Sequence, residues 1–159
     1  RIWSALEDAS PREGTFMHGF TYSGHPVGSA VAMANLDVIE RDNLVELAAE
    51  NGPYLLEGLK ARLKDNPFIG DIRGIGMMAA VEYVADRASK RPFPPGTAPH
   101  RLVAKQATEQ GVLTRGLPFL PVNSFSPPLN ITRDEIDAGL DRFAKAVELS
   151  MTEIQCMAG

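Results

Sequence analysis

The order of secondary structure along this 159-residue chain predicts an α+β domain that follows a long helical region. Apolar residues recur at helical spacing between residues 26 and 63, and short β-compatible runs alternate with expected helices from residue 68 onward. Asp65-Asn66-Pro67 separates the two parts, because the residue before a proline is disfavoured in the helical basin. We therefore predict a first domain over residues 1–64 and a second over residues 65–159.

The helical region is expected to begin after an irregular stretch. Residues 1–24 contain the turn signals Ser10-Pro11 and Glu13-Gly14 and show no helical period. A helix is predicted over residues 26–40, where a proline suits the first helical position. The apolar stripe then continues, but Gly52-Pro53 interrupts it and predicts either a kinked helix or two helices in succession.

The second domain is expected to alternate strands with helices. Residues 68–73 and 77–84 are β-compatible runs around Gly74-Ile75-Gly76, which predicts a hairpin or a bent strand pair. The later expected elements are an exposed proline-rich connection over 89–99, a helix over 98–110, a strand over 112–115 and a loop over 116–122. Thr132 to Glu135 form a capping box, which predicts the start of the last helix.

Composition excludes several classes of partner. The 16 Lys and Arg residues are scattered among 20 Asp and Glu, giving a net charge of -4 without a basic field for nucleic acid or anionic lipid. No apolar run approaches the ~20 residues of a membrane-spanning helix. The single cysteine, Cys156, cannot form an internal disulfide, which fits a reducing compartment. We expect a cytoplasmic protein, and the start without Met or signal peptide hints at a fragment.

The stretch from Phe16 to Pro26 has the most unusual contents. It places three hydroxyl side chains and two glycines directly before an expected helix N-terminus. Free N–H groups and the positive end of the helix dipole favour an anion such as phosphate there, and a hydroxyl adds a donor. A hydroxyl-rich helix cap with aromatic packing is the other interpretation, and the residues alone favour it.

A family resemblance links these segments. The run HGFTYSGHPVGSAVAMANLDVIE resembles the segment of omega-transaminases, within the class III aminotransferases, that follows the cofactor lysine and leads into a long helix. GDIRGIGMMAAVEYVADRASKRPF resembles the opening strands of that family's small domain, and GVLTRG and FSPPLNITRDEID resemble its closing strands and last helix. Together these matches cover nearly all of residues 14–150 in the family's order.

The resemblance implies a fold and a chemistry. The parent would be an α/β, fold-type I, pyridoxal 5'-phosphate-dependent transferase, and this chain its C-terminal part. Residues 1–64 would end the large domain, with the phosphate-binding loop and a kinked interdomain helix, and residues 65–159 would form a small α+β domain with a short antiparallel sheet. The implied reaction moves an amino group from an amine or amino acid to a keto acid such as pyruvate, in a homodimer.

The resemblance also implies roles for three residues. Thr21 and Phe20 would bind the cofactor phosphate across the dimer interface. Arg115 would bind a substrate carboxylate and swing away for an apolar amine; the alternative is an arginine that ends a strand and pairs with a nearby acid. The following loop, Leu117 to Pro121, is more apolar than the polar stretch common in relatives, which leaves the substrate preference open.

No residue is assigned a catalytic role. Transamination needs a Schiff-base lysine, which in the family precedes the threonine loop, whereas the first lysine here is Lys60. The chain is therefore expected to be inactive alone. Two alternatives remain: a module that dimerises and closes over substrate without catalysis, and a related pyridoxal-phosphate aminomutase or decarboxylase.

The remaining polar candidates are expected to be structural. Arg73 is interpreted as an architectural residue that makes ion pairs or carbonyl contacts. His18 and His25 lack a carboxylate or cysteine at ligand spacing, so they predict hydrogen bonding within the loop and no metal site. His100 is expected on the surface.

Overall fold

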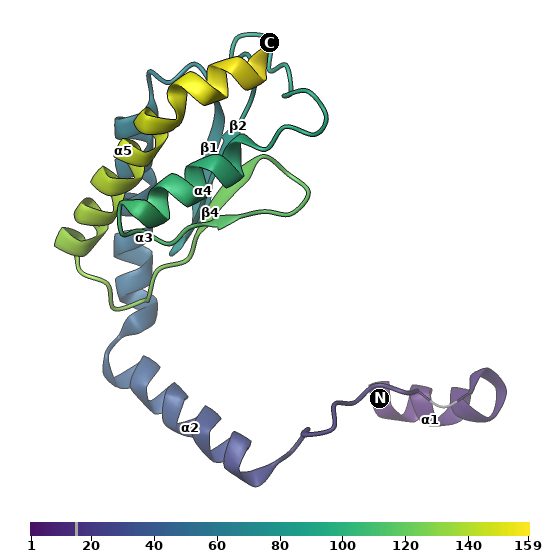
Figure 1. Cartoon of the computed structure of the whole chain (residues 1–159). Coiled ribbons are helices and arrows are strands. Elements are labelled where there is room, and N and C mark those ends of the chain that lie inside the picture. The colour runs from purple at the N-terminus through teal and green to yellow at the C-terminus, as the bar shows by residue number, and fades with distance from the viewer. Residues whose placement is uncertain (15) are drawn as a thin grey trace. The chain divides into compact units, whose positions relative to one another are not determined.

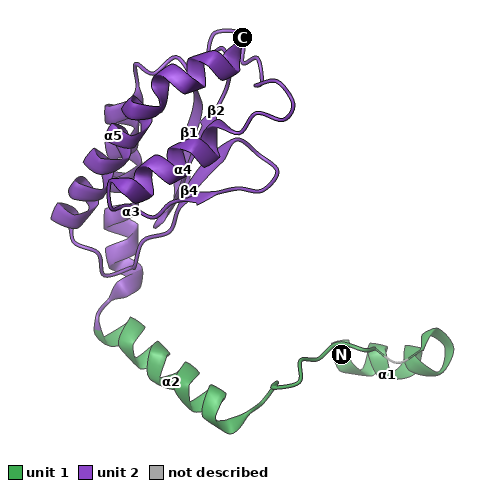
Figure 2. Cartoon of the chain, in the orientation of Figure 1, with its two compact units in different colours: residues 1–41 green, residues 42–159 purple. Residues whose placement is uncertain are grey.

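The computed structural model describes residues 1–14 and 16–159, which form two compact units, residues 1–41 and 42–159 (Figure 2). The first unit holds helices α1 (Ile2–Glu13) and α2 (Pro26–Arg41). The second unit contains, in chain order, α3 (Leu44–Leu63), β1 (Ile69–Ile75), β2 (Met78–Tyr83), α4 (Pro99–Glu109), β3 (Arg115–Gly116), β4 (Val122–Phe125) and α5 (Arg133–Ala158) (Figure 1).

In the first unit, the predicted irregular start is wrong and the predicted helix from residue 26 is confirmed. Residues 2–13 form a helix, so the prediction of an irregular start is wrong for this stretch. Pro11 lies in the last turn of α1, and Gly14, at a φ of 89°, donates its N–H to the Ser10 carbonyl at 3.1 Å. The turn signals therefore mark where the helix ends, since a left-handed glycine is a common helix terminator. The predicted helix from residue 26 is confirmed as α2.

The break between the two long helices lies at a different place from the predicted one. α2 ends at Arg41, and Asn43 adopts a left-handed φ of 49° before α3 begins. α3 then runs through Pro53 without ending, so the prediction of an interruption at Gly52-Pro53 is wrong in position. Asparagine tolerates the left-handed region better than most residues, which explains the break. α3 packs within the second unit, and the boundary at residues 64 and 65 stays a prediction about the parent's domains.

The second unit is a four-stranded antiparallel sheet with helices on one face. The strand order is β1-β2-β4-β3, and the predicted hairpin over residues 68–84 is confirmed as β1 and β2. Along β2, Ala79, Val81 and Tyr83 are buried and alternate with more exposed residues. The buried set belongs to one core with side chains from α3, α4 and α5. The opposite face of the sheet carries the alternating residues.

The predicted helices of this unit are confirmed, and one predicted strand is shortened. α4 ends before Gly111, which has a φ of 83°, as predicted. Thr132 caps α5 through a complete capping box with Glu135. The strand expected over 112–115 is reduced to β3, because only Arg115 and Gly116 pair with β4.

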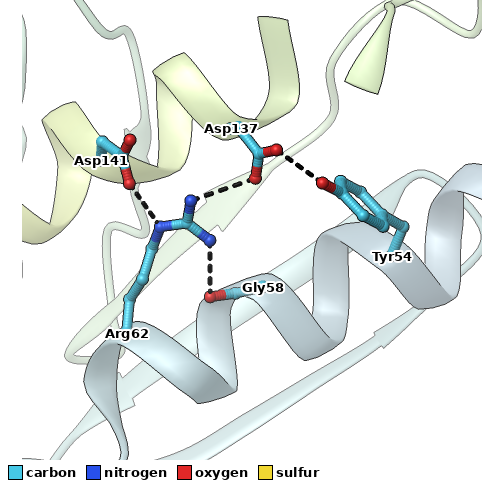
Figure 3. A network of polar contacts seen from close by, with 5 residues as sticks. All are labelled: Tyr54, Gly58, Arg62, Asp137 and Asp141. Atoms are coloured by element: carbon cyan, nitrogen blue, oxygen red, sulfur yellow. Dashed lines mark hydrogen bonds and ion pairs between the residues drawn. The ribbon is translucent and has the colours of Figure 1, made fainter. Parts of the chain in front are cut away.

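A polar network fastens α3 to α5 beside the apolar core (Figure 3). Arg62 of α3 donates to Asp141 at 2.6 Å and to Asp137 at 3.0 Å, and the hydroxyl of Tyr54 donates to Asp137 at 2.5 Å. The Tyr54 hydrogen bond is the main reason that the pKa of Asp137 is lowered. A charge-assisted hydrogen bond is stronger than a neutral one, so this network fixes the orientation of the two helices.

Candidate functional site

The residues predicted to bind a phosphate form a tight turn before α2. The N–H of Phe20 donates to Ser23 Oγ at 3.1 Å, and the N–H of Ser23 donates back to the Phe20 carbonyl at 2.9 Å. Gly24 has a φ of 71°, and the N–H of His25 donates to the Tyr22 carbonyl at 3.1 Å. These bonds close the backbone on itself and direct the chain into the helix.

Thr21 lies at the exposed side of this turn. Its side chain is exposed, and within the described part of the chain its hydroxyl has no hydrogen-bond partner. α2 begins five residues later at Pro26, and because proline has no N–H, the first backbone donors of this helix without intrahelical partners are those of Val27 and Gly28. A free hydroxyl close to such donors suits a phosphate dianion, so the residues present fit the phosphate group of the implied cofactor.

Phe20 offers a ligand different groups from those of Thr21. Its backbone N–H is already used by Ser23 Oγ, while its ring is 77% exposed. The rings of His18 and Phe20 meet edge to face at 5.9 Å, and those of Tyr22 and His25 at 6.1 Å. The loop thus contains the aromatic packing of the second sequence interpretation as well as a free hydroxyl, and Phe20 has only its side chain to offer to a ligand.

Arg115 lies in the second unit, separately from Thr21 and Phe20. It begins the edge strand β3, pairs in register with Ser124 of β4, and has an exposed side chain. Among the residues the structure describes, its guanidinium forms no ion pair, so the alternative of a local acid partner finds no support. The sequence does not predict that Ser124 is the neighbour of Arg115, because the pairing of two segments is not visible in their local patterns.

Arg115 borders a cavity of about 660 Å³. The cavity walls are mostly apolar and come from α3, α5 and the segments flanking β3 and β4. Its lining includes Leu55, Val112, Leu113, Phe125, Ile131, Ile136 and Leu140, with Thr114, Arg115, Ser124, Ser126 and Glu135 as polar members. A largely apolar cavity with a few polar groups at one side is typical of small-molecule sites.

The other cationic side chains singled out by the sequence are engaged locally. Arg73 donates to Asp71 at 2.9 Å and to Glu82 at 2.5 Å, which confirms the interpretation of Arg73 as an architectural residue. These two hydrogen bonds raise the pKa of Arg73. Lys60 pairs with Glu57 at 2.9 Å on the surface of α3. Neither residue points to a catalytic role.

His100 is buried, and the prediction that it lies on the surface is wrong. The residue is 5% exposed at the start of α4, and its carbonyl accepts a hydrogen bond of 3.0 Å from Asn123 Nδ2. Its ring nitrogens have no hydrogen-bond partner of normal geometry among the described residues. The ring packs near Gly116, where a Cβ would lie 3.1 Å from His100 Cδ2. Gly116 of β3 therefore lies directly against the imidazole ring of His100.

Burial lowers the pKa of His100, which predicts a pH-dependent stability. The unfolded chain binds a proton near pH ~6.5, whereas the folded chain keeps the ring neutral to lower pH. Stability is therefore full above pH ~6.5 and falls as the pH drops below it, since protons then bind more readily to the unfolded state. Urea unfolding at pH 7.5 and 5.5 should show a smaller loss for His100→Leu than for the unchanged chain; equal losses would contradict the prediction.

Comparisons with known proteins identify the family. The family described as Aminotransferase class-III matches residues 3–147, and the chain belongs to this family. The fold predicted from the sequence, part of a fold-type I transaminase with a short antiparallel sheet, is confirmed. Enzymes of this family use pyridoxal phosphate. No helix among the described residues is long and apolar enough to cross a membrane.

Particular relatives are transaminases. The chain is 42% identical to the diaminobutyrate–2-oxoglutarate transaminase of Halomonas elongata, a match that covers 92% of this chain and 31% of that protein. It is 37% identical to gamma aminobutyrate transaminase 2 of Solanum lycopersicum, over 92% of this chain and 31% of that protein. The chain thus spans about a third of the length of these relatives.

A solved structure has a similar fold. The omega transaminase from Pseudomonas jessenii in complex with PMP has a TM-score of 0.82 and 40% sequence identity, with 96% of this chain and 33% of that chain covered.

Proposed function

We propose that this chain is the part of an omega-transaminase that completes its cofactor phosphate site and its substrate site. The parent moves an amino group from an amine or amino acid to a keto acid such as pyruvate, as a homodimer in the cytoplasm. The observation that carries this proposal is the Thr21 turn, which is exposed and offers an unused hydroxyl directly before α2, in a chain that matches the family over residues 3–147. The chain alone is inactive, because the Schiff-base lysine is absent.

The chain's own residues bind and orient rather than react. Pyridoxal phosphate supplies the electron sink on which the amino-group transfer depends. The Thr21 hydroxyl and the free N–H groups at the start of α2 would hold the phosphate of the partner subunit's cofactor, and the ring of Phe20 would pack beside that phosphate. A hydroxyl donor binds the phosphate without adding a group that titrates near neutral pH.

Arg115 provides the second function of the chain, recognition of the substrate carboxylate. A guanidinium presents paired donors that match the two carboxylate oxygens. Its free position on an edge strand allows the long side chain to turn toward a carboxylate or away from an apolar amine. Arg115 can therefore accept two kinds of substrate in turn: one with a carboxylate, which it binds, and one with an apolar group, from which it turns away.

Thr21 is tested by coenzyme affinity. In a chimera in which residues 3–147 replace the matching third of the Pseudomonas jessenii omega transaminase, Thr21→Ala should weaken pyridoxal phosphate binding by about 10- to 150-fold, since a hydrogen bond to a charged group contributes about 1.5–3 kcal/mol. Equilibrium dialysis measures the affinity. Thr21→Ser should keep most of it, and Thr108→Ala, which alters an exposed hydroxyl on α4, is the control. Unchanged affinity in Thr21→Ala would refute the role of the hydroxyl.

The activity is tested with the same chimera. It should transfer the amino group of an amine to pyruvate, whereas the isolated 159-residue chain should show no turnover. A chimera that folds, dimerises and binds pyridoxal phosphate but transfers no amino group would favour the assembly module without catalysis. Turnover to a decarboxylated or rearranged product would favour the related decarboxylase or aminomutase.

A further inference from the structure

The strand that carries Arg115 is short and lies at the edge of the sheet. β3 consists of Arg115 and Gly116, and in the strand order β1-β2-β4-β3 its neighbour is β4. Just after β3, the N–H of Leu117 donates to the Val122 carbonyl at 2.9 Å and closes the β3–β4 hairpin. The register of a short strand that contains glycine is weakly specified by its own pairing. The backbone that supports the Arg115 side chain therefore depends on contacts from outside the hairpin.

The first turn of α4 provides such contacts through His100. Gly116 of β3 and Asn123 of β4 are opposite each other in register. A Cβ at Gly116 would lie 3.1 Å from His100 Cδ2, so the strand backbone lies against the imidazole ring. Asn123 is 0% exposed, and its Nδ2 donates to the His100 carbonyl at 3.0 Å. α4 is thus attached to both strands at the same pair of residues, by packing on β3 and by a hydrogen bond on β4.

These contacts lie on the sheet face opposite the Arg115 side chain. Successive residues of a strand point to opposite faces. Gly116 and Asn123 face α4, and Val81, the partner of Asn123 on β2, is buried in the core. Arg115 directly precedes Gly116, so its exposed side chain projects from the other face. His100 and Asn123 therefore hold the Arg115 backbone from the helix side without occupying the space around its guanidinium.

His100 and Asn123 are polar residues in a largely apolar interior. His100 is 5% exposed, and among the described residues neither its ring nitrogens nor Asn123 Oδ1 has a hydrogen-bond partner of normal geometry. A buried polar group without a partner costs free energy, so apolar residues of similar size would be more stabilising at both positions. Buried polar residues are retained in some proteins because they fix one arrangement of neighbouring segments. The Asn123–His100 hydrogen bond, which joins residues 23 apart along the chain, suits such a role.

We propose that His100 and Asn123 are positioning residues for Arg115, which fix the backbone of β3 so that the guanidinium meets a substrate carboxylate in one place. This inference rests on the proposed role of Arg115 and adds two residues that do not touch the substrate. An arginine that turns toward and away from a ligand needs a fixed backbone, because its paired donors must return to the same geometry each time. Loss of either contact would leave the Arg115 side chain intact but widen the range of positions that it occupies.

The first test measures hydrogen exchange in the 159-residue chain by NMR. His100→Ala and Asn123→Leu should each speed the exchange of the Leu117 amide about 2- to 12-fold, the effect of losing one hydrogen bond or a contact of similar free energy. The amide of Val84, which donates to the Phe68 carbonyl, should exchange at an unchanged rate. His100→Leu should keep the slow exchange of Leu117, because leucine fills the same space and the imidazole ring acts on β3 through packing.

The second test compares two substrates in the chimera with the Pseudomonas jessenii omega transaminase. His100→Ala and Asn123→Leu should raise the KM for pyruvate about 2- to 12-fold. They should leave the KM for 1-phenylethylamine unchanged, because this amine has no carboxylate for Arg115 to bind. Leu59→Ala is the matched control, since it removes a side chain of α3 that is 1% exposed, and it should leave the ratio of the two KM values unchanged.

An unchanged rate of Leu117 exchange in both variants would overturn the inference. Equal increases in the two KM values would also overturn it, because they would indicate a general loss of structure, and so would faster Leu117 exchange with an unchanged KM for pyruvate. If His100→Ala does not fold, Asn123→Leu, which keeps the buried volume, decides. An inactive chimera would refute the proposed function, and the exchange measurement, which needs neither cofactor nor turnover, would then decide by itself whether α4 anchors β3.

Discussion

Phe143→Ala should lower the free energy of unfolding of the second unit by about 3–5 kcal/mol, the range for removing a fully buried aromatic side chain. Phe143 is 0% exposed on α5 and meets the ring of Phe125 edge to face at 4.7 Å. Alanine would lose the transfer free energy of the ring and leave a cavity between α5 and β4, and the aromatic pair itself contributes about 0.5–1.5 kcal/mol. Urea unfolding followed by circular dichroism measures the change.

The control for this variant lies on the same helix. Leu149 is 49% exposed, so Leu149→Ala should change the free energy of unfolding by less than ~1 kcal/mol. Similar effects from the two substitutions would mean that α5 does not pack against the sheet through Phe143. Because Phe125 also lines the cavity next to Arg115, Phe143→Ala should change the shape of that cavity as well.

Sequence patterns predict well those elements whose formation depends on local chemistry. The capping box at Thr132 and Glu135 fixes the start of α5 by bonds between residues three apart, and it is confirmed. The β1–β2 hairpin is likewise local. The prediction of an irregular start is wrong for α1 because Pro11 and Gly14 are turn signals that also occur at the end of a helix. Pro53 differs, because it lies in the middle of α3 and the helix continues through it.

Features that depend on the packing of distant segments were not accessible from the sequence. The burial of His100 follows from its contact with Gly116 and Asn123, which are sixteen or more residues away along the chain. The pairing of Arg115 with Ser124 depends on the register of a two-residue strand, which no apolar pattern specifies. The turn at Thr21 is closed by bonds between residues three apart, so its shape depends on local chemistry, while the role of Thr21 in phosphate binding stays a prediction.

Gly52→Ala should destabilise the second unit although alanine favours helix. A Cβ at Gly52 of α3 would lie 2.4 Å from the carbonyl oxygen of Gly76 and 2.6 Å from its carbonyl carbon, at the turn between β1 and β2. Both neighbours are backbone atoms, so the hairpin or the helix must move. Overpacking of this kind costs about 1–3 kcal/mol, which is comparable to or larger than the ~1 kcal/mol that alanine gains over glycine in a helix.

Gly139→Ala separates the two contributions. Gly139 also lies inside a helix, α5, but a Cβ there would have no atom within 4 Å. Gly139→Ala should therefore stabilise the unit by about 0.5–1 kcal/mol, and Gly52→Ala should destabilise it in the same urea titration. If both substitutions stabilise the chain, α3 and the β1–β2 turn are not in close backbone contact. Opposite signs would instead show that glycine is required at position 52 because the β1–β2 turn approaches the backbone of α3 there, directly before Pro53.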